Sequence, residues 1–312
     1  MTKLESLHSL IGNTPLIKIK YKYNNNIRYV YAKLEWYNLT GSIKDRVALG
    51  IISNAYKTNT LTPHQTIVET TSGKMGISLS AIGNYLGHPV VIFMPKHMSK
   101  ERQEILKLYG AKLILLDSFA DCFREANIYA KKHNAFLSLQ FENIDNPLSH
   151  YSSTAIEISE KITPKYFVAG VGTAGTLMGV GKYLVEHFDS KIIAVEPKSS
   201  LILSSGYSHG HHKLQGLSDD IIPNIYDKNL VNDIISVSDE DAIAMAQKLS
   251  STLGLGVGIS SGANMIGAIL SNKKEVVTIF TDDNKKYIST DLVYPTISKL
   301  VDSVELISYE VI

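Results

Sequence analysis

Short, continuously apolar runs alternate along the chain with longer segments of mixed polarity. A continuous run such as residues 90–94 is typical of a strand that is buried on both faces of a parallel sheet. The expected strands are residues 27–34, 66–69, 90–94, 113–116, 135–139, 166–169, 192–195, 234–237 and 276–280.

Segments with apolar residues at helical spacing lie between these strands. The clearest are residues 76–86, 101–109 and 239–253, and the last of these opens with acidic residues, as a helix start should. Alternating strands and helices over most of the length predict an α/β protein with doubly wound sheets. Because ligands of such sheets bind beyond the carboxyl ends of the strands, functional residues are expected in the turns that follow strands.

Composition narrows the classes of protein that remain. At roughly 100–200 residues per domain, 312 residues suggest two domains or one large unit. Lys and Arg number 31 against 30 Asp and Glu, so the net charge of +1 gives no general attraction to nucleic acid or to an anionic membrane. The apolar runs are too short to span a bilayer, and the one cysteine, Cys122, fits a reducing compartment. We expect a cytoplasmic protein whose anion sites are built locally.

Glycine and hydroxyl residues gather in turns between an expected strand and an expected helix. The turns are residues 38–46, 70–76, 170–176 and 258–264. In the first, Lys44 lies at or near a helix start, where the helix dipole disfavours an ammonium. This placement suits a lysine that must lose its charge to act as a nucleophile. A surface lysine paired with Asp45 fits the same residues.

The later turns are suited to anions. Residues 70–76 offer three hydroxyls and successive backbone N–H groups, which can bind a carboxylate or a phosphate. An ordinary Ser/Thr helix cap is the simpler alternative there and at residues 258–264. Residues 170–175 read G-x-G-x-x-G, with Glu196 about twenty residues later, which is the dinucleotide-binding pattern. The same turn would equally hold one phosphate monoester.

Ordered segments from residue 11 to about residue 292 resemble the cysteine synthase (O-acetylserine sulfhydrylase) and cystathionine β-synthase family. These segments are residues 11–16, 32–35, 41–46, 140–143, 172–176, 194–197, 212–216 and 259–262. Members are pyridoxal-phosphate enzymes of the tryptophan-synthase-β fold. The resemblance implies a large cofactor-binding domain, residues 1–40 and 146–312, and a smaller mobile substrate domain, residues 41–145. It also implies a homodimer.

The resemblance further implies a role for each turn. Lys44 would hold pyridoxal 5′-phosphate as an imine and later move the Cα proton, while Ser260 would hydrogen-bond the pyridine nitrogen. The cofactor phosphate would be bound by Gly172, Thr173, Ala174, Gly175 and Thr176. The small amino-acid substrate would meet Thr71, Ser72, Gly73, Lys74, Met75, Gln140 and Gly216, and Lys74 would also contact the cofactor. We expect no metal.

One departure from the family pattern introduces a positive charge. The family loop reads Thr-Ser-Gly-Asn-Thr-Gly, whereas Lys74 and Met75 stand here for its asparagine and small hydroxyl residue. If Lys74 points inward, its repulsion of a cationic imine is roughly 4 kcal/mol at about 4 Å and an effective dielectric near 20, so it should change imine protonation or meet an anionic substrate group. If it points outward, the cofactor's phenolic oxygen loses a partner.

Two other departures introduce acids. Beyond Gly216, where the family commonly has small residues, the chain has Asp219 and Asp220. A carboxylate there would repel a sulfide anion but could act as general base for water or a thiol; two solvated loop acids are the alternative. Near the cofactor ring, Thr-Asp-Asp-Asn at residues 281–284 replaces Pro-Ser-Ser-Gly. Residues after about Tyr294 have no counterpart in the family pattern.

We therefore predict a pyridoxal-phosphate-dependent β-replacement enzyme. The leading reaction is that of cysteine synthase, in which O-acetylserine and sulfide give cysteine and acetate through an aminoacrylate. With the same intermediate, Asp219 or Asp220 could activate water so that cysteine yields hydrogen sulfide and serine, or Lys74 could favour O-phosphoserine. Two further alternatives are an attenuated paralogue with a binding role and, more remotely, a dinucleotide-dependent enzyme.

Overall fold

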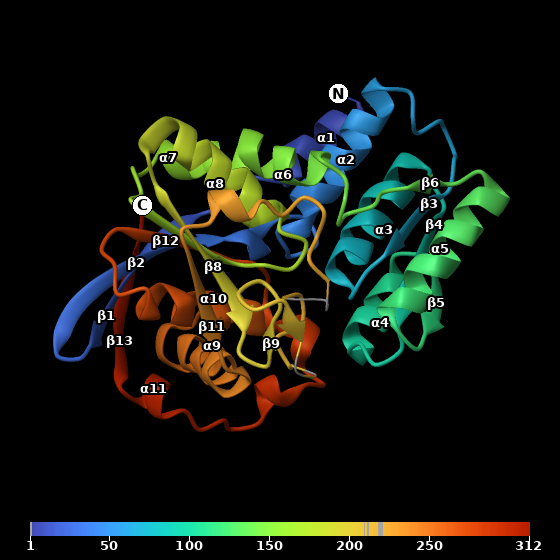
Figure 1. The fold of residues 1–312 in the computed structure, drawn as a ribbon. Helices are drawn as coiled ribbons and strands as arrows, with labels where there is room; N and C mark the ends of the chain where they lie inside the picture. Colours follow the sequence, from blue (N-terminus) through green and yellow to red (C-terminus); the bar gives the residue numbers. More distant parts are fainter. Residues whose placement is uncertain (1, 209, 211, 218–220) are drawn as a thin grey trace.

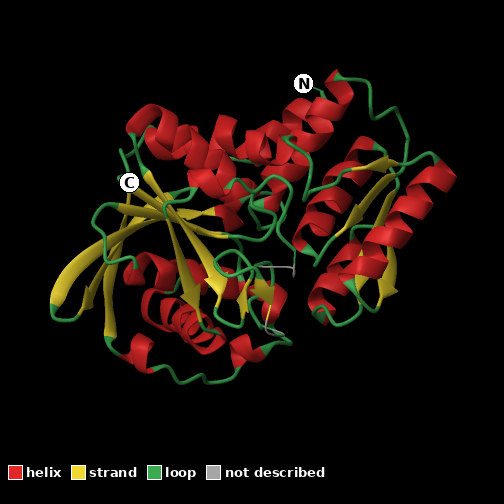
Figure 2. Ribbon diagram, in the orientation of Figure 1, coloured by secondary structure: helices red, strands yellow, loops and turns green. Residues whose placement is uncertain are grey.

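The computed structural model describes residues 2–208, 210, 212–217 and 221–312. Two large β-sheets, each covered by helices, stand side by side (Figures 1 and 2), and two short strands, β9 (Ser200–Leu201) and β10 (Tyr207–Ser208), form a separate pair. The architecture is α/β, as predicted, with each sheet contributing its own buried core. No helix in the described part of the chain is long and apolar enough to cross a membrane.

The larger sheet has seven strands in the order β11-β8-β7-β12-β2-β1-β13. Their bounds are β11 Asp233–Val237, β8 Lys191–Pro197, β7 Tyr166–Gly170, β12 Val276–Phe280, β2 Asn26–Leu34, β1 Leu16–Tyr23 and β13 Val304–Val311. Neighbours from β11 to β2 pair in parallel, whereas β1 pairs antiparallel with both β2 and β13. The sequence pattern did not predict β1 and β13, because their apolar and polar residues alternate instead of forming continuous runs.

The smaller sheet has four parallel strands in the order β5-β4-β3-β6. Its strands are β5 Lys112–Leu116, β4 Val90–Pro95, β3 Ile67–Thr70 and β6 Phe136–Leu137, and its helices are α3 Lys74–Leu86, α4 Lys100–Leu108 and α5 Phe119–His133. Every residue of β3 and β4 is buried. This is the burial expected of continuous apolar runs between two helical layers.

The remaining elements surround and join the two sheets. Helix α2, Lys44–Lys57, packs against both α3 and α6, Asp145–Ser149, and so connects the two units. The other elements are α1 Lys3–Leu10, η1 Glu35–Tyr37, the π-helix η2 His150–Thr154, α7 Ala155–Ser159, α8 Gly175–Phe188, β9 Ser200–Leu201, β10 Tyr207–Ser208, η3 Lys228–Leu230, α9 Asp239–Leu253, α10 Ile259–Leu270, η4 Asn284–Tyr287, η5 Asp291–Val293 and α11 Lys299–Asp302.

Candidate active site

One cavity collects nearly all the residues that the sequence assigns to a site. The predicted residues that line it are Lys44, Thr71, Ser72, Lys74, Met75, Gln140, Gly172, Thr173, Ala174, Gly175, Thr176, Gly216 and Ser260. Gly73 lies beside them at the start of α3, with a φ of 136° that favours glycine. Asp219 and Asp220 lie outside the described residues.

Lys44 is the first residue of α2 and reaches across the cavity to the turn after β7. Its Nζ donates to the Thr173 hydroxyl at 3.2 Å. Asp45, the alternative partner from the sequence, instead accepts from the backbone N–H and the hydroxyl of Thr40, at 2.7 and 2.6 Å. The structure therefore aims Lys44 at the glycine-rich turn, while Asp45 pairs with Thr40.

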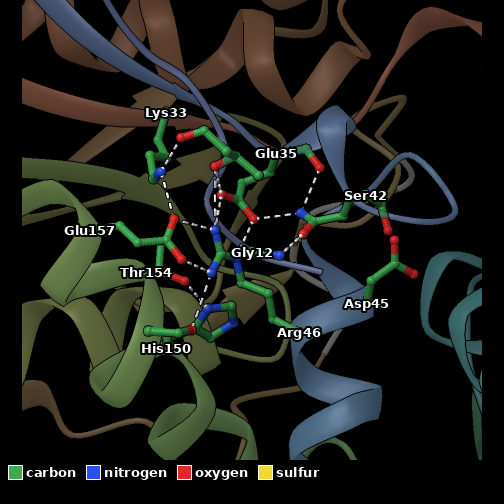
Figure 3. A network of polar contacts seen from close by, with 12 residues as sticks. Gly12, Lys33, Glu35, Ser42, Asp45, Arg46, His150, Thr154 and Glu157 are labelled. Atoms are coloured by element: carbon green, nitrogen blue, oxygen red, sulfur yellow. Dashed lines mark hydrogen bonds and ion pairs between the residues drawn. The ribbon is translucent and has the colours of Figure 1, made fainter. Parts of the chain in front are cut away.

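A network of buried charges fixes α2 two residues beyond Lys44 (Figure 3). The Arg46 guanidinium donates to both carboxylate oxygens of Glu35, at 2.7 and 2.9 Å, and to both of Glu157, at 2.6 and 2.8 Å. Lys33 pairs with Glu157 at 2.7 Å. Burial alone would raise the pKa of Glu157, but Arg46 and Lys33 hold it down to about 2. Two cations and two carboxylates thus anchor α2 to β2 and α7.

The turn between β7 and α8 is shaped to hold an anion. The first N–H groups of a helix have no intrahelical acceptor and lie at the positive end of its dipole. An added Cβ at Gly172 would lie 2.3 Å from the Gly216 carbonyl oxygen, and one at Gly175 would lie 1.9 Å from Asn146 Oδ1. Glycine is therefore required at position 172 for this close approach of two backbone segments, and at position 175 it leaves room for the Asn146 side chain.

Asn146 completes the cradle and was not predicted from the sequence. Its Nδ2 donates to Thr173 Oγ1 at 2.9 Å and to the Gln140 carbonyl at 2.8 Å. Its Oδ1 is buried without a hydrogen-bond partner in the described structure. The amide thus holds the Thr173 hydroxyl and the backbone of Gln140 in place beside the start of α8.

Glu196 argues against the dinucleotide hypothesis. A ribose-binding acid must present its carboxylate to the ligand. Here the Glu196 carboxylate is buried and accepts hydrogen bonds from its own loop, from the Leu203 N–H at 2.9 Å and from the Ser204 N–H at 3.4 Å. The glycine turn therefore stands as a site for a single phosphate.

The turn after β3 is joined to the segment that carries Gln140 by a buried carboxylate, Glu69. Its Oε2 accepts from the Ser138 hydroxyl at 2.7 Å and from the Gln140 N–H at 3.1 Å, and its Oε1 accepts from the Thr70 N–H at 2.8 Å. Burial raises the pKa of Glu69 to about 7. Nothing in the sequence pattern singled out Glu69, because an isolated acid within an apolar strand has no local signature of its partners.

Lys74 points inward, which resolves the alternative that the sequence left open. Its Nζ lies 3.4 Å from Asp282 Oδ2 and donates to the Tyr287 hydroxyl at 3.3 Å and to Ser260 Oγ at 3.4 Å. Burial alone would lower the pKa of the ammonium, but the Asp282 carboxylate and the Tyr287 hydroxyl together more than offset burial, and the pKa is raised. The anion that this inward lysine meets is a carboxylate of the protein itself and not the anionic substrate group that was expected.

Two departures from the family pattern are therefore partners in space. Lys74 stands for the family's asparagine, and Asp282 lies in the segment that replaces Pro-Ser-Ser-Gly. Tyr287 supports the pair by donating to Asp282 Oδ2 at 2.9 Å. The departure at residues 281–284 was the available sequence signal for Asp282, while Tyr287 carried none.

The combined geometry fits pyridoxal phosphate. A lysine amine, an anion-binding helix start and the Ser260 hydroxyl border one cavity, and each suits a different group of that cofactor. Lys44 would hold the aldehyde, residues 172–176 the phosphate, and Ser260 the ring nitrogen. Helix-start N–H groups and a hydroxyl are donors to a phosphate and to a ring nitrogen, and an amine is the group that condenses with an aldehyde, so the chemistry of the lining matches the cofactor.

Comparisons with known proteins agree with this fit. The family model described as "Pyridoxal-phosphate dependent enzyme" matches residues 7–282. Cysteine synthase B of Campylobacter jejuni is 42% identical over 299 residues, covering 92% of this chain and 98% of its own, and cysteine synthase of Staphylococcus aureus is 38% identical over 301 residues, covering 93% and 97%.

Solved structures extend the likeness to the fold. A hydrogen sulfide-producing enzyme from Fusobacterium nucleatum superposes with a TM-score of 0.95 at 42% identity, covering 99% of this chain and 98% of that one. Cysteine synthase from Entamoeba histolytica gives a TM-score of 0.85 at 35% identity, covering 97% and 94%. The chain belongs to the pyridoxal-phosphate-dependent enzymes, in the group that contains the cysteine synthases.

Proposed function

We propose that this β-replacement enzyme splits cysteine with water into hydrogen sulfide and serine. The likeness to the Fusobacterium hydrogen sulfide-producing enzyme, with its TM-score of 0.95 over nearly the whole of both chains, carries the proposal. The Entamoeba cysteine synthase superposes less closely, at 0.85. This observation reverses the order in which the sequence alone ranks the two reactions.

Each site residue has a part in that reaction. When bound, pyridoxal phosphate supplies an electron-withdrawing ring that acidifies the substrate Cα proton and lets the Cβ substituent leave. Lys44 would hold the aldehyde and then take up the Cα proton, since its Nζ already lies against the phosphate turn. Thr71, Ser72 and Gln140 would bind the substrate carboxylate at the opposite wall of the cavity.

Water activation is proposed for the acids of the segment after Gly216. The C–S bond breaks, sulfur leaves as hydrogen sulfide after taking up a proton, and a water oxygen bonds to Cβ as its proton passes to Asp219 or Asp220. A structure of the Fusobacterium-type enzyme with one aspartate changed to asparagine contains an α-aminoacrylate intermediate. That finding supports an acidic residue acting after the sulfur has left.

Cysteine synthesis from O-acetylserine and sulfide is the second candidate. It is favoured by the 42% identity to the Campylobacter cysteine synthase B over almost the whole chain. The two reactions share every group described above and differ in the leaving group and nucleophile. O-phosphoserine gains no support from Lys74, because Asp282 already neutralises that charge.

A matrix of donors and nucleophiles tests the proposal. Purified holoenzyme is given cysteine, O-acetylserine or O-phosphoserine, each with water or sulfide, and serine, cysteine and sulfide are quantified. We expect cysteine with water to be the fastest pair. A rate with O-acetylserine and sulfide that is tenfold higher would instead establish cysteine synthesis, and cofactor binding without turnover of any pair would establish an attenuated paralogue.

Single substitutions test the proposed base. Asp219→Asn or Asp220→Asn should slow serine formation while cofactor binding, followed by absorbance, is unchanged. If neither variant alters any rate, these acids do not activate water.

We also propose the domain division, assembly and location that the family resemblance implies. Residues 41–145 would close over the substrate, and two copies would form a homodimer in the cytoplasm. Light scattering on the purified protein and cell fractionation test the last two points. Scattering of the cofactor-bound protein with and without cysteine tests closure through a decrease in radius.

A further inference from the structure

Two primary amines line the cavity, yet the cofactor has one aldehyde. Lys44 and Lys74 are each the first residue of a helix, and both border the same space. An uncharged amine condenses with an aldehyde by forming a C=N bond and releasing one water, whereas an ammonium has no electron pair for this step. Placement at the start of a helix beside the cavity therefore does not by itself distinguish the two lysines.

Their tertiary contacts do distinguish them. The side chain of Lys74 is about 7% exposed and that of Asp282 is wholly buried, with 3.4 Å between ammonium and carboxylate. A charge pair at this distance away from water strongly favours the ammonium form. Lys44, in contrast, has among its contacts the Thr173 hydroxyl of the phosphate turn, at 3.2 Å from its Nζ.

Asp282 is itself held firmly in place. Tyr287 donates to its Oδ2 at 2.9 Å and Thr281 to its Oδ1 at 3.1 Å, while its backbone carbonyl accepts from the Gly258 N–H at 3.0 Å. Its backbone also forms a bridge with Ser42, two residues before Lys44. The carboxylate is thus fixed by the large-sheet unit while its partner lysine begins α3 of the small-sheet unit.

The Lys74 ammonium is also engaged as a hydrogen-bond donor, which does not suit a nucleophile. It donates to Ser260 Oγ at 3.4 Å, and Ser260 is in turn 2.7 Å from the Thr281 hydroxyl. An added Cβ at Gly216 would lie 2.9 Å from Lys74 Nζ, so this glycine leaves the space that the lysine occupies.

We propose that Asp282 is a positioning residue that keeps Lys74 a charged donor to Ser260, so that Lys44 alone condenses with the cofactor aldehyde. The inference rests on the proposed role of Lys44 and not on which substrates are used. It accounts for both family departures together: a second lysine in the cavity is compatible with the chemistry because an acid accompanies it.

Chemical trapping shows which lysine carries the cofactor. The protein is loaded with pyridoxal phosphate and treated with borohydride, which reduces C=N to a stable amine, and the modified lysine is located by peptide mass spectrometry. We expect wild-type label on Lys44. Lys44→Ala should carry less than a tenth of that label on Lys74, and Lys44→Ala/Asp282→Asn at least fivefold more than Lys44→Ala.

Asp283→Asn in the Lys44→Ala background is the matched control. Asp283 is the neighbouring acid and pairs with Lys286 at 3.2 Å, so its loss should leave Lys74 unlabelled. Asp282→Ser, which restores a residue of the family pattern, is a second way to release Lys74. Circular dichroism establishes that each variant is folded.

Two results would overturn the proposal. One is label on Lys74 of Lys44→Ala as complete as that on wild-type Lys44; this variant keeps the Asp282 pair and decides the question even if both Asp282 variants unfold. The other is a folded Asp282 variant that adds no label. Wild-type label elsewhere than on Lys44 would be a different failure, that of the proposed site, and none of these results depends on the substrate assays.

Discussion

The starts of α2 and α3 form a natural pair within this molecule. Each helix follows a turn rich in glycine and hydroxyl residues, and each opens with a lysine, Lys44 or Lys74, where the helix dipole opposes a positive charge. Their surroundings differ. Lys44 contacts a hydroxyl of the phosphate turn, and its helix is anchored by Arg46; Lys74 is anchored directly through its own charge to Asp282.

The difference shows how two lysines, each at the start of a helix, can have two different chemical roles. At α2 the anchoring charge lies two residues beyond the lysine, on Arg46 (Figure 3), and Lys44 Nζ donates to the Thr173 hydroxyl of the phosphate turn. At α3 the lysine itself supplies the anchor, and its amine is occupied as a donor. The residue across the cavity, and not the helix start, determines which lysine can act as a nucleophile.

Removing the α2 lysine should have the largest effect. Lys44→Ala should lower turnover about 10⁴-fold, because both the attachment of the cofactor and the transfer of the Cα proton depend on this amine. Sulfide release at saturating cofactor measures the loss. Lys74→Ala is the control and should retain more activity; equal losses in the two variants would contradict the division of roles.

Breaking the α3 anchor should chiefly affect stability. Asp282→Asn leaves the buried Lys74 ammonium without its counter-ion, and losing one partner of such a pair costs about 3–5 kcal/mol. Urea denaturation monitored by circular dichroism gives the free energy of unfolding. Adding Lys74→Met should recover part of the loss, since removing both charges leaves neither unpaired; strictly additive effects would show that the two residues are not coupled.

The strand before α3 predicts a pH dependence. Because the pKa of Glu69 is raised from 4.5 to about 7, the folded state binds this proton more tightly than the unfolded state. The resulting stabilisation is complete below pH 4.5 and disappears as pH rises past 7, a loss of about 3 kcal/mol. Unfolding free energies measured from pH 4.5 to 7.5 should show this extra decrease in wild type relative to Glu69→Gln. Parallel curves for the two proteins would contradict it.

The smallest expected effect concerns the partner of Lys44. Thr173→Val removes the acceptor of hydrogen bonds from both Lys44 and Asn146 and should cost about 1–3 kcal/mol, or roughly 5- to 150-fold in cofactor affinity. Titration with pyridoxal phosphate, followed by absorbance, measures the dissociation constant. Thr173→Ser, which keeps the hydroxyl, should bind almost as tightly as wild type.

Local signals were sufficient for the elements whose pattern is strong. The continuous apolar runs of β3, β4, β7 and β12 correspond to buried parallel strands. The glycine-rich turns lie at the starts of α3, α8 and α10, as expected. The strands β1 and β13 were not predicted, because a strand that alternates apolar and polar residues lacks that signal.

The residues of the site likewise fall into those that a local motif predicted and those that it did not. Lys44, Thr173 and Ser260 were found because each belongs to a short motif at a helix start. Glu69 and Tyr287 were not, because each acts through partners distant in the sequence, with which no periodic pattern connects it.

The sequence by itself determined most of the parallel strands with the helices between them, the motif residues of the site and the family to which they belong. Backbone N–H groups and hydroxyls at helix starts provide the anion sites, so the net charge of +1 carried little information about them. The tertiary structure alone decided the role of Lys74. Its charge and that of Asp282 would each be costly to bury separately, and only the fold, by placing the start of α3 against the segment after β12, makes them a neutral pair.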